Sequence, residues 1–363
     1  MPRGAHRPSA AGYRHAAARA TFPFLLFLVL AAPTVAIAAT YVVVDLGATP
    51  PGISAVVRGL NDSGEAVGGS ITFGMGHRGF VVTPTSLEMI DGLAGSDYTI
   101  AFGINRLSQI VGSSNTGTSV RAFRWTRQQG AEDLGTLGGD NSAVAFAINS
   151  PGQVVGYSSG PQGTRAVLWG VGGGITNLGT LPGGRGSRAL AISDSGRVVG
   201  VSGTQSGDRG FRWTTAAGLQ DLGTLPGDTE SEAVSINNTG DAVGSSTNSS
   251  GARAVVWPAG GTIQSLGTLP GGSHSRARGI NDVGMIVGSS GSTVGTRAFL
   301  WTPSGGLRDL NNLIPQPSTF VLVGALAINN SGTILAIGRD ATLDPHDEHE
   351  AHELPIRVFL LVP

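Results

Sequence analysis

The amino-acid sequence predicts an all-β protein, a seven-bladed β-propeller of four-stranded antiparallel blades. Three observations lead to this prediction. The same sequence motifs recur with a period of 44 residues over most of the chain. Each period contains four short strand-like segments separated by tight turns. Residues 39–47 read as the fourth strand of a repeat and residues 356–362 as a third strand, so the two segments together would complete one blade.

Three sequence markers, each present seven times, define the repeat. An Asp-Leu-Gly marker precedes a Gly/Pro-rich turn, and its first position holds Asp45, Met89, Asp133, Asn177, Asp221, Ser265 and Asp309. An Ile-Asn marker precedes a hairpin turn, and its second position holds Asn61, Asn105, Asn149, Ser193, Asn237, Asn281 and, after a short insertion, Asn329. An Arg-Ala-Phe-Leu-Trp marker begins at Arg78, Arg121, Arg165, Arg209, Arg253, Arg297 and Arg357.

The repeat that follows Leu266 shows the four strands most clearly. Its expected strands are, in order, residues 275–281, 285–290, 297–302 and 307–310. Gly284 suits the left-handed position that follows a type I turn, and a glycine recurs there in every repeat except the one with Ser108. Tight turns of this kind join strands that pair antiparallel.

One such four-stranded sheet is too small to be stable alone, so the sheets must stack. Pairs such as Val198-Val199 place apolar side chains on both faces of the second strand, as expected for a sheet covered on each side by a neighbour. Radial stacking provides this arrangement. Pairing of residues 39–47 with the last blade would close the ring and leave no exposed edge at that point.

Residues 1–38 have the pattern of a secretory signal peptide, with four arginines before an apolar run that ends in small residues. We therefore expect a single domain at residues 39–363 in an exported protein, extracellular or periplasmic. That domain carries 19 basic and 24 acidic residues, a net charge of −5, which argues against a nucleic-acid partner. The chain has no cysteine, which excludes disulfides and thiolate metal sites.

The repeated wording DLGTLPGG, AIN followed by GxVVG, and RAFLW resembles the HAF family of bacterial extracellular repeat proteins. The resemblance covers nearly all of residues 39–363. The chain departs from the family at its defining triplet, because Arg-Ala-Phe at Arg121 and Arg297 stands where the family has His-Ala-Phe. The resemblance implies an exported repeat protein without an assigned catalytic residue.

The arginines that open the third strands have two interpretations, an anion-binding ring or cross-strand ion pairs. The expected hairpin register places Arg121, Arg209 and Arg297 opposite Asp133, Asp221 and Asp309, which favours ion pairs of about 0.2–1 kcal/mol each. Arg165 and Arg253 face no acidic residue in that register. They are therefore the members of the set predicted to be free for a ligand.

Sequence variation between repeats concentrates in the connections between blades and in the loops between second and third strands. In an up-and-down blade both sets of loops emerge on one face, which we call the loop face, and loops on a rigid scaffold are common binding sites. The predicted binding residues are Arg165, Arg185, Arg188, Asp228, Glu230, Arg253, His274 and Arg276. The five tryptophans, 44 residues apart, are expected to pack between sheets instead.

The period breaks at residues 339–356, an acidic loop that contains His346, His349 and His352. Histidines three residues apart could share one face of a helical turn and ligate a divalent metal such as zinc. The alternative is a solvated acidic loop without a second shell to fix a metal site. A divalent metal at this loop is the only cofactor that the sequence suggests.

These observations together favour a monomeric binding or interaction module whose partner is an unknown protein or glycan. Two alternatives remain. One is a polysaccharide-acting enzyme with its site in the axial funnel, although the sequence shows no catalytic motif such as Gly-x-Ser-x-Gly or His-Glu-x-x-His. The other is metal capture by the histidine-rich loop. Acidic and basic residues from different blades that converge near the axis would favour the enzyme.

Overall fold

The computed structural model describes residues 41–48, 53–72, 76–341 and 356–363. Residues 39–363 form one compact unit, and all the described elements belong to it. The signal peptide predicted at residues 1–38 lies outside the described residues. No helix in the described ranges is long and apolar enough to cross a membrane.

The described chain contains 28 strands and one short 3-10 helix, η1 (Leu310–Leu313), so the all-β prediction is confirmed. The strands fall into four sets by their place in the repeat. The first strands are β2 (Ile53–Leu60), β6 (Tyr98–Ile104), β10 (Ser142–Ile148), β14 (Ser187–Ile192), β18 (Glu230–Ile236), β22 (Ser275–Ile280) and β26 (Phe320–Ile328). The second strands are β3 (Ala66–Thr72), β7 (Ile110–Asn115), β11 (Val154–Gly160), β15 (Val198–Thr204), β19 (Ala242–Asn248), β23 (Ile286–Ser290) and β27 (Ile334–Asp340).

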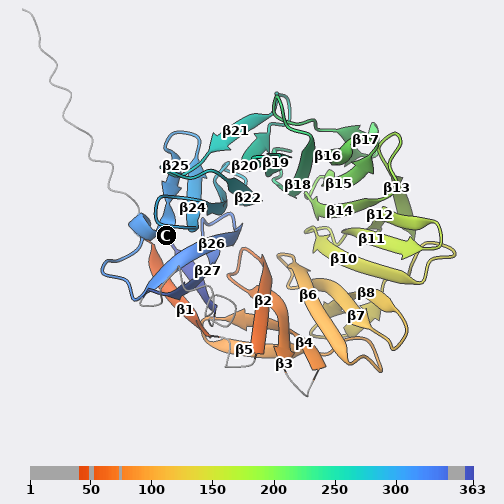
Figure 1. The fold of residues 1–363 in the computed structure, drawn as a ribbon. Helices are drawn as coiled ribbons and strands as arrows, with labels where there is room; N and C mark the ends of the chain where they lie inside the picture. Colours follow the sequence, from red (N-terminus) through yellow and green to blue (C-terminus); the bar gives the residue numbers. More distant parts are fainter. Residues whose placement is uncertain (1–40, 49–52, 73–75, 342–355) are drawn as a thin grey trace, which may run out of the picture. The chain divides into compact units, whose positions relative to one another are not determined.

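The third and fourth strands lie farther out in Figure 1. The third strands are β4 (Gly76–Thr83), β8 (Val120–Thr126), β12 (Gly163–Trp169), β16 (Gly207–Thr214), β20 (Gly251–Trp257), β24 (Arg297–Thr302) and β28 (Arg357–Val362). The fourth strands are β5 (Ser86–Ile90), β9 (Gly130–Asp133), β13 (Ile175–Gly179), β17 (Gly218–Asp221), β21 (Gln264–Gly267), β25 (Gly306–Asp309) and β1 (Val42–Ala48).

Consecutive strands pair antiparallel into four-stranded sheets, β10–β13, β14–β17, β18–β21 and β22–β25. The groups β2–β5 and β6–β9 have the same order and are joined into one larger sheet by a single parallel pair, His77 with Tyr98. The remaining sheet has the order β1-β28-β27-β26, in which Val42 pairs with Val362 and Ala48 with Arg357. Strands from the two ends of the described chain therefore share one sheet.

Apolar clusters lie between neighbouring sheets. One joins Val67 and Val81 to Phe123 and Trp125, from β2–β5 and β6–β9, and another joins β2–β4 to β27 and β28. Trp125, Trp169 and Trp257 are buried, and Trp213 and Trp301 pack against such clusters. The predicted packing role of the tryptophans is confirmed.

The first strands are the innermost ones in Figure 1, and each contacts the first strand of the next group, including β26 with β2. Small residues permit this approach, since a Cβ on Gly103 would lie 2.8 Å from the carbonyl oxygen of Phe146. Each first strand also has a β-bulge at the same repeat position. The bulged residues are Arg58, Phe102, Phe146, Leu190, Val234, Arg278 and Leu326.

The bulge explains the glycine that follows the Val-Val pair of the second strand. A Cβ on Gly200 would lie 2.0 Å from the carbonyl oxygen of Arg188, on the bulged strand β14, and the same contact would be 1.9 Å between Gly156 and Val144. No side chain fits there without movement of the backbone. The glycine is thus required by a close approach of two strands.

We predict that Gly200→Ala lowers the free energy of unfolding by about 1–3 kcal/mol, the usual cost of overpacking a filled site. Gly172→Ala is the matched control, because its added Cβ would meet no atom within 4 Å. Chemical denaturation of both variants gives the comparison. Equal denaturation midpoints for the two variants would contradict the assignment of a steric role to Gly200.

Candidate functional site

Asparagine side chains connect the first strands at the end where each Ile-Asn turn begins, which we call the turn face. Each side-chain amide donates a hydrogen bond to the main-chain oxygen at the same position of the next repeat. These bonds run from Asn61 to Asn105 (3.2 Å), Asn105 to Asn149 (3.0 Å), Asn149 to Ser193 (3.0 Å), Asn237 to Asn281 (3.1 Å), Asn281 to Asn329 (3.1 Å) and Asn329 to Asn61 (3.1 Å). At Ser193 a hydroxyl replaces the amide, and no such bond leaves it among the described residues.

The same asparagines also hold their own turns. The side-chain oxygen of Asn61 accepts hydrogen bonds from the main-chain N–H groups of Ser63 and Glu65, both at 3.0 Å. Asn105 does the same with Leu107 and Gln109. Each asparagine therefore satisfies buried main-chain groups in two repeats, which explains its recurrence in the sequence.

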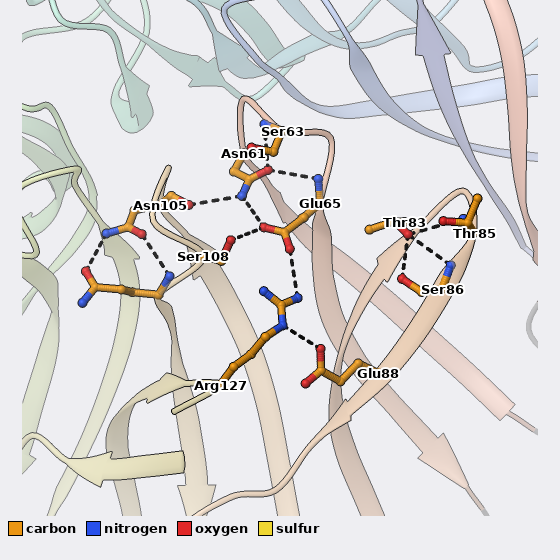
Figure 2. A network of polar contacts seen from close by, with 11 residues as sticks. Asn61, Ser63, Glu65, Thr83, Thr85, Ser86, Glu88, Asn105, Ser108 and Arg127 are labelled. Carbon is orange, nitrogen blue, oxygen red and sulfur yellow. Dashed lines mark hydrogen bonds and ion pairs between the residues drawn. The ribbon is translucent and has the colours of Figure 1, made fainter. Parts of the chain in front are cut away.

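Figure 2 shows the most extensive version of this network. Glu65 accepts hydrogen bonds from Asn61 (2.7 Å) and from the hydroxyl of Ser108, and it pairs with Arg127 at 2.9 Å. Arg127 also pairs with Glu88 at 2.9 Å. Since Ser108 and Arg127 belong to the following repeat, the network joins the groups β2–β5 and β6–β9.

Glu65 is ionised in this network, and its side chain is only 12% exposed. Burial alone would raise the pKa of Glu65, but hydrogen bonds from Ser108, Asn61 and Arg127 and the charge of Arg127 outweigh it. The pKa of Glu65 is therefore lowered below the usual value of 4.5. The carboxylate stabilises the fold and is fully committed to protein partners.

A cavity of about 210 Å³ lies at the turn face and is lined by residues of all the Ile-Asn turns. The residues that follow each asparagine position surround it: Asp62, Arg106, Ser150, Asp194, Asn238, Asp282 and Asn330. Most of their side-chain oxygens accept main-chain N–H groups, as in the 2.8 Å bond from Ser150 to Asp194 and the 3.0 Å bond from Asn330 to Asp62. The carboxylates here form a second set of links between repeats.

The opposite end of the first strands is the loop face. There Arg188 and Arg276 are exposed at the start of β14 and β22. Arg58 and Arg278 are exposed at the bulge position, which lies two residues closer to the turn face. None of these four arginines takes part in an ion pair or donates a hydrogen bond within the described part of the protein, and Arg188 additionally contacts an aromatic ring. Their guanidinium groups keep free N–H donors.

The predicted cross-strand pairs of the third-strand arginines are correct in part. Arg121 pairs with Asp133 at 3.0 Å as predicted, and Arg357, for which no pair was predicted, pairs with Asp45. The predicted register is wrong by two residues, because Phe123, Phe211 and Phe299, not the arginines, lie opposite Asp133, Asp221 and Asp309. The ion pairs predicted for Arg209 and Arg297 are absent among the described residues, although Arg121 forms its pair across the same diagonal.

Two predicted binding residues have structural partners instead. Arg253, predicted to be free, pairs with Asp228, and the fully buried Asp228 side chain also accepts hydrogen bonds from Ser246 (2.6 Å) and Asn248 (2.7 Å). The hairpin register could not predict this pair, because Asp228 lies in the connection before the blade of Arg253, 25 residues earlier in the sequence. Both side chains fix that connection.

The other predicted residues lie on the loop face and take part in no ion pair among the described residues. Arg165 is half-buried and donates to the main-chain oxygens of Thr164 (3.0 Å) and Arg185 (3.4 Å). Arg185, Glu230 and His274 are exposed. The structure therefore places Arg165 beside Arg185 and leaves Arg188 and Arg276 on the inner strands.

The proposed metal ligands His346, His349 and His352 lie outside the described residues. Within the described ranges no group of three or more histidine or acidic side chains has the arrangement of a metal site.

No protein-family model matches the chain, and no curated protein matches it in sequence. Among solved structures it is similar to a selenomethionine-substituted virginiamycin B lyase from Staphylococcus aureus, with a TM-score of 0.53 and 10% identity over 89% of this chain and 100% of the lyase. A second match is TolB from Acinetobacter baumannii, with a TM-score of 0.47 and 10% identity over 72% of this chain. The chain spans 63% of the length of TolB.

A third match is the β-propeller domain of the Trilobed protease from Pyrococcus furiosus, with a TM-score of 0.48 and 8% identity over 70% of this chain and 81% of that domain. At such identities the likeness to the lyase concerns the fold alone. Together with the stacked four-stranded sheets described above, it identifies a β-propeller fold.

We predict that Glu65→Gln lowers the free energy of unfolding by about 1.5–3 kcal/mol at neutral pH, the usual contribution of hydrogen bonds to a charged group. Because the pKa of Glu65 is lowered in the folded state, its contribution is complete above pH 4.5 and is lost as the pH falls through the lowered pKa. Thermal unfolding from pH 7 downward should therefore show the wild type and the variant converging in acid.

Glu88→Gln is the control for this pH series, because Glu88 pairs with the same Arg127 but its side chain is 41% exposed. Removal of such a surface pair should cost at most about 1 kcal/mol. A difference between wild type and Glu65→Gln that stays constant from pH 7 to acid would contradict the role given to the Glu65 carboxylate.

Proposed function

We propose that the chain is an exported, closed, seven-bladed β-propeller that works as a binding module through its loop face. The seven first strands, the contact of β26 with β2 and the shared sheet of β1 and β28 support the closed arrangement. The signal pattern at residues 1–38 and the resemblance to the HAF family of extracellular repeat proteins support export.

One observation carries the proposed binding role: the two ends of the first strands differ in how their polar groups are used. At the turn face, asparagine and aspartate side chains form hydrogen bonds between repeats, and Arg106 is an exposed arginine without an ion pair among the described residues. At the loop face, the exposed Arg188 and Arg276 have no ion pair within the described part of the protein. Unpaired guanidinium groups on a rigid scaffold can form bidentate hydrogen bonds with an anionic ligand.

The placement of the carboxylates favours binding over glycoside hydrolysis. Hydrolysis needs two carboxyl groups on opposite sides of the scissile bond. Glu230 and Glu232 lie on the same strand, β18, two residues apart, and Asp228 is buried in the contacts with Arg253 and Ser246. Asp62, Asp194 and Asp282 do line the turn-face cavity together with Arg106, but each of these aspartates accepts a main-chain N–H group of another repeat. The proposed ligand is therefore held by arginines, and its class is an acidic glycan or an acidic segment of a protein.

We predict that a glycan array probed with the protein purified after export gives binding to acidic glycans, and that the double variant Arg188→Glu, Arg276→Glu weakens this binding at least about 10-fold. Two lost charge-assisted hydrogen bonds justify that magnitude. An acidic peptide array, with the same variants, tests the protein alternative.

Arg106→Glu is the matched control, because Arg106 is an exposed arginine at the turn face, in the turn that follows β6. Circular dichroism should show unchanged folding for all variants, since the substituted side chains are exposed. The proposal fails if neither array gives a signal, or if the loop-face variants bind as the wild type does.

A further inference from the structure

Three aromatic rings form a continuous row along consecutive groups of strands. The ring centroids of Phe102 on β6 and Phe146 on β10 are 5.3 Å apart with an interplanar angle of 75°, an edge-to-face contact. Phe146 in turn lies 5.7 Å from the ring of Tyr157 on β11. Both distances are within the range of favourable aromatic pairs.

An arginine lies at each end of this row. The guanidinium carbon of Arg58 is 5.7 Å from the centroid of the Phe102 ring, and that of Arg188 is 5.7 Å from the centroid of the Tyr157 ring. Both distances fit cation–π contacts. We call the five residues Arg58, Phe102, Phe146, Tyr157 and Arg188 the aromatic arc.

Core packing does not account for the aromatic arc. The repeat already has a packing phenylalanine, and its copies Phe123, Phe211 and Phe299 are fully buried. The rings of the aromatic arc are only half-buried, and both of its arginines are exposed. Partly exposed rings beside exposed cations are typical of ligand-binding surfaces and not of cores.

The bulge brings these side chains together. Arg58, Phe102 and Phe146 occupy the bulge position of three successive first strands, and those strands contact one another. The remaining bulge positions hold Leu190, Val234, Arg278 and Leu326, so the aromatic side chains are confined to one part of the inner surface. The aromatic character is specific to these repeats and is not a requirement of the fold.

The electrostatic surroundings favour an anion. Neither Arg58 nor Arg188 takes part in an ion pair in the described ranges. Each guanidinium group therefore carries a positive charge beside the aromatic rings without a carboxylate to balance it, which favours an anionic ligand.

We propose that the aromatic arc binds an aromatic carboxylate, with the ligand ring against Phe102 and Phe146 and the carboxylate on the free N–H donors of Arg58 or Arg188. The inference rests on the proposed binding function and narrows its ligand at this site to one chemical class. Aromatic rings supply stacking surface, and a planar guanidinium donates two parallel N–H hydrogen bonds to the oxygens of a carboxylate. Of the two proposed ligand classes, an acidic protein segment presents this chemistry, through an aromatic side chain next to an acidic one.

Isothermal titration calorimetry with 2-naphthoate tests the proposal, and 2-naphthalenemethanol serves as the neutral probe of the same ring. We expect 2-naphthoate to bind with a dissociation constant below about 1 mM and the alcohol at least about 10-fold more weakly. Arg58→Gln and Arg188→Gln should each weaken naphthoate binding, and the stronger effect, about 10-fold or more, identifies the arginine that holds the carboxylate.

Phe102→Leu tests the contribution of the aromatic ring to binding independently of the arginine charge, because it keeps an apolar side chain and removes the aromatic face. This variant should weaken both probes, whereas Arg106→Gln, at the turn face, should change neither. Thermal unfolding of each variant shows whether the fold is retained. Absence of naphthoate binding by the folded wild type, or equal binding by Arg58→Gln, Arg188→Gln and wild type, overturns the proposal.

The calorimetry with 2-naphthoate and the array experiment test different statements, so one can fail while the other holds. If acidic glycans bind in a manner sensitive to Arg188 and Arg276 but naphthoate does not bind, the aromatic arc is rejected and the binding module stands. If naphthoate binds at the arc but both arrays are blank, the aromatic-carboxylate inference stands and the glycan or peptide ligand class is rejected.

Discussion

A single hydrogen bond between repeats, from an asparagine amide to the main-chain oxygen at the same position of the next repeat, constrains the rest of this structure. Because donor and acceptor occupy the same position in successive repeats, each turn must lie against the equivalent turn of its neighbour. In four of these links the two residues are 44 positions apart, and in the link from Asn281 to Asn329 they are 48 apart. Extra residues in the last repeat are therefore accommodated elsewhere, and the turns stay aligned.

Close approach of the turns determines what the first strands can contain. Small residues such as Gly103 are needed where one first strand meets the next, and the glycine after the Val-Val pair is needed where the second strand meets the bulge. These contacts between strands do not determine which side chain stands at the bulge position. It varies between arginine, phenylalanine, leucine and valine, which is how one repeated scaffold can carry a local surface of distinct chemistry.

Much of the fold could be predicted because its determinants are local. Period, turn glycines and strand lengths are all visible in the sequence, and even the exception at Ser108 adopts the left-handed conformation expected of the turn, with φ of 55°. The register between third and fourth strands was predicted two residues out, because the sequence does not show which residue of a short hairpin lies directly opposite another. The contact of Arg253 with Asp228 was missed since it crosses from one connection to a different hairpin.

The aromatic arc shows why the candidate site was harder to predict than the fold. Phe102 and Phe146 are 44 residues apart in the sequence, and Tyr157 lies on a different strand, so no local pattern joins them. Arg188 was already a candidate as a varying residue of the loop face, whereas Arg58 and the two phenylalanines were not. The available signal was variation at one repeat position between residues of very different chemistry. In a repeat protein, positions that agree between copies report the contacts that build the scaffold, and positions that disagree, once their neighbours in space are known, report what the scaffold presents to a ligand.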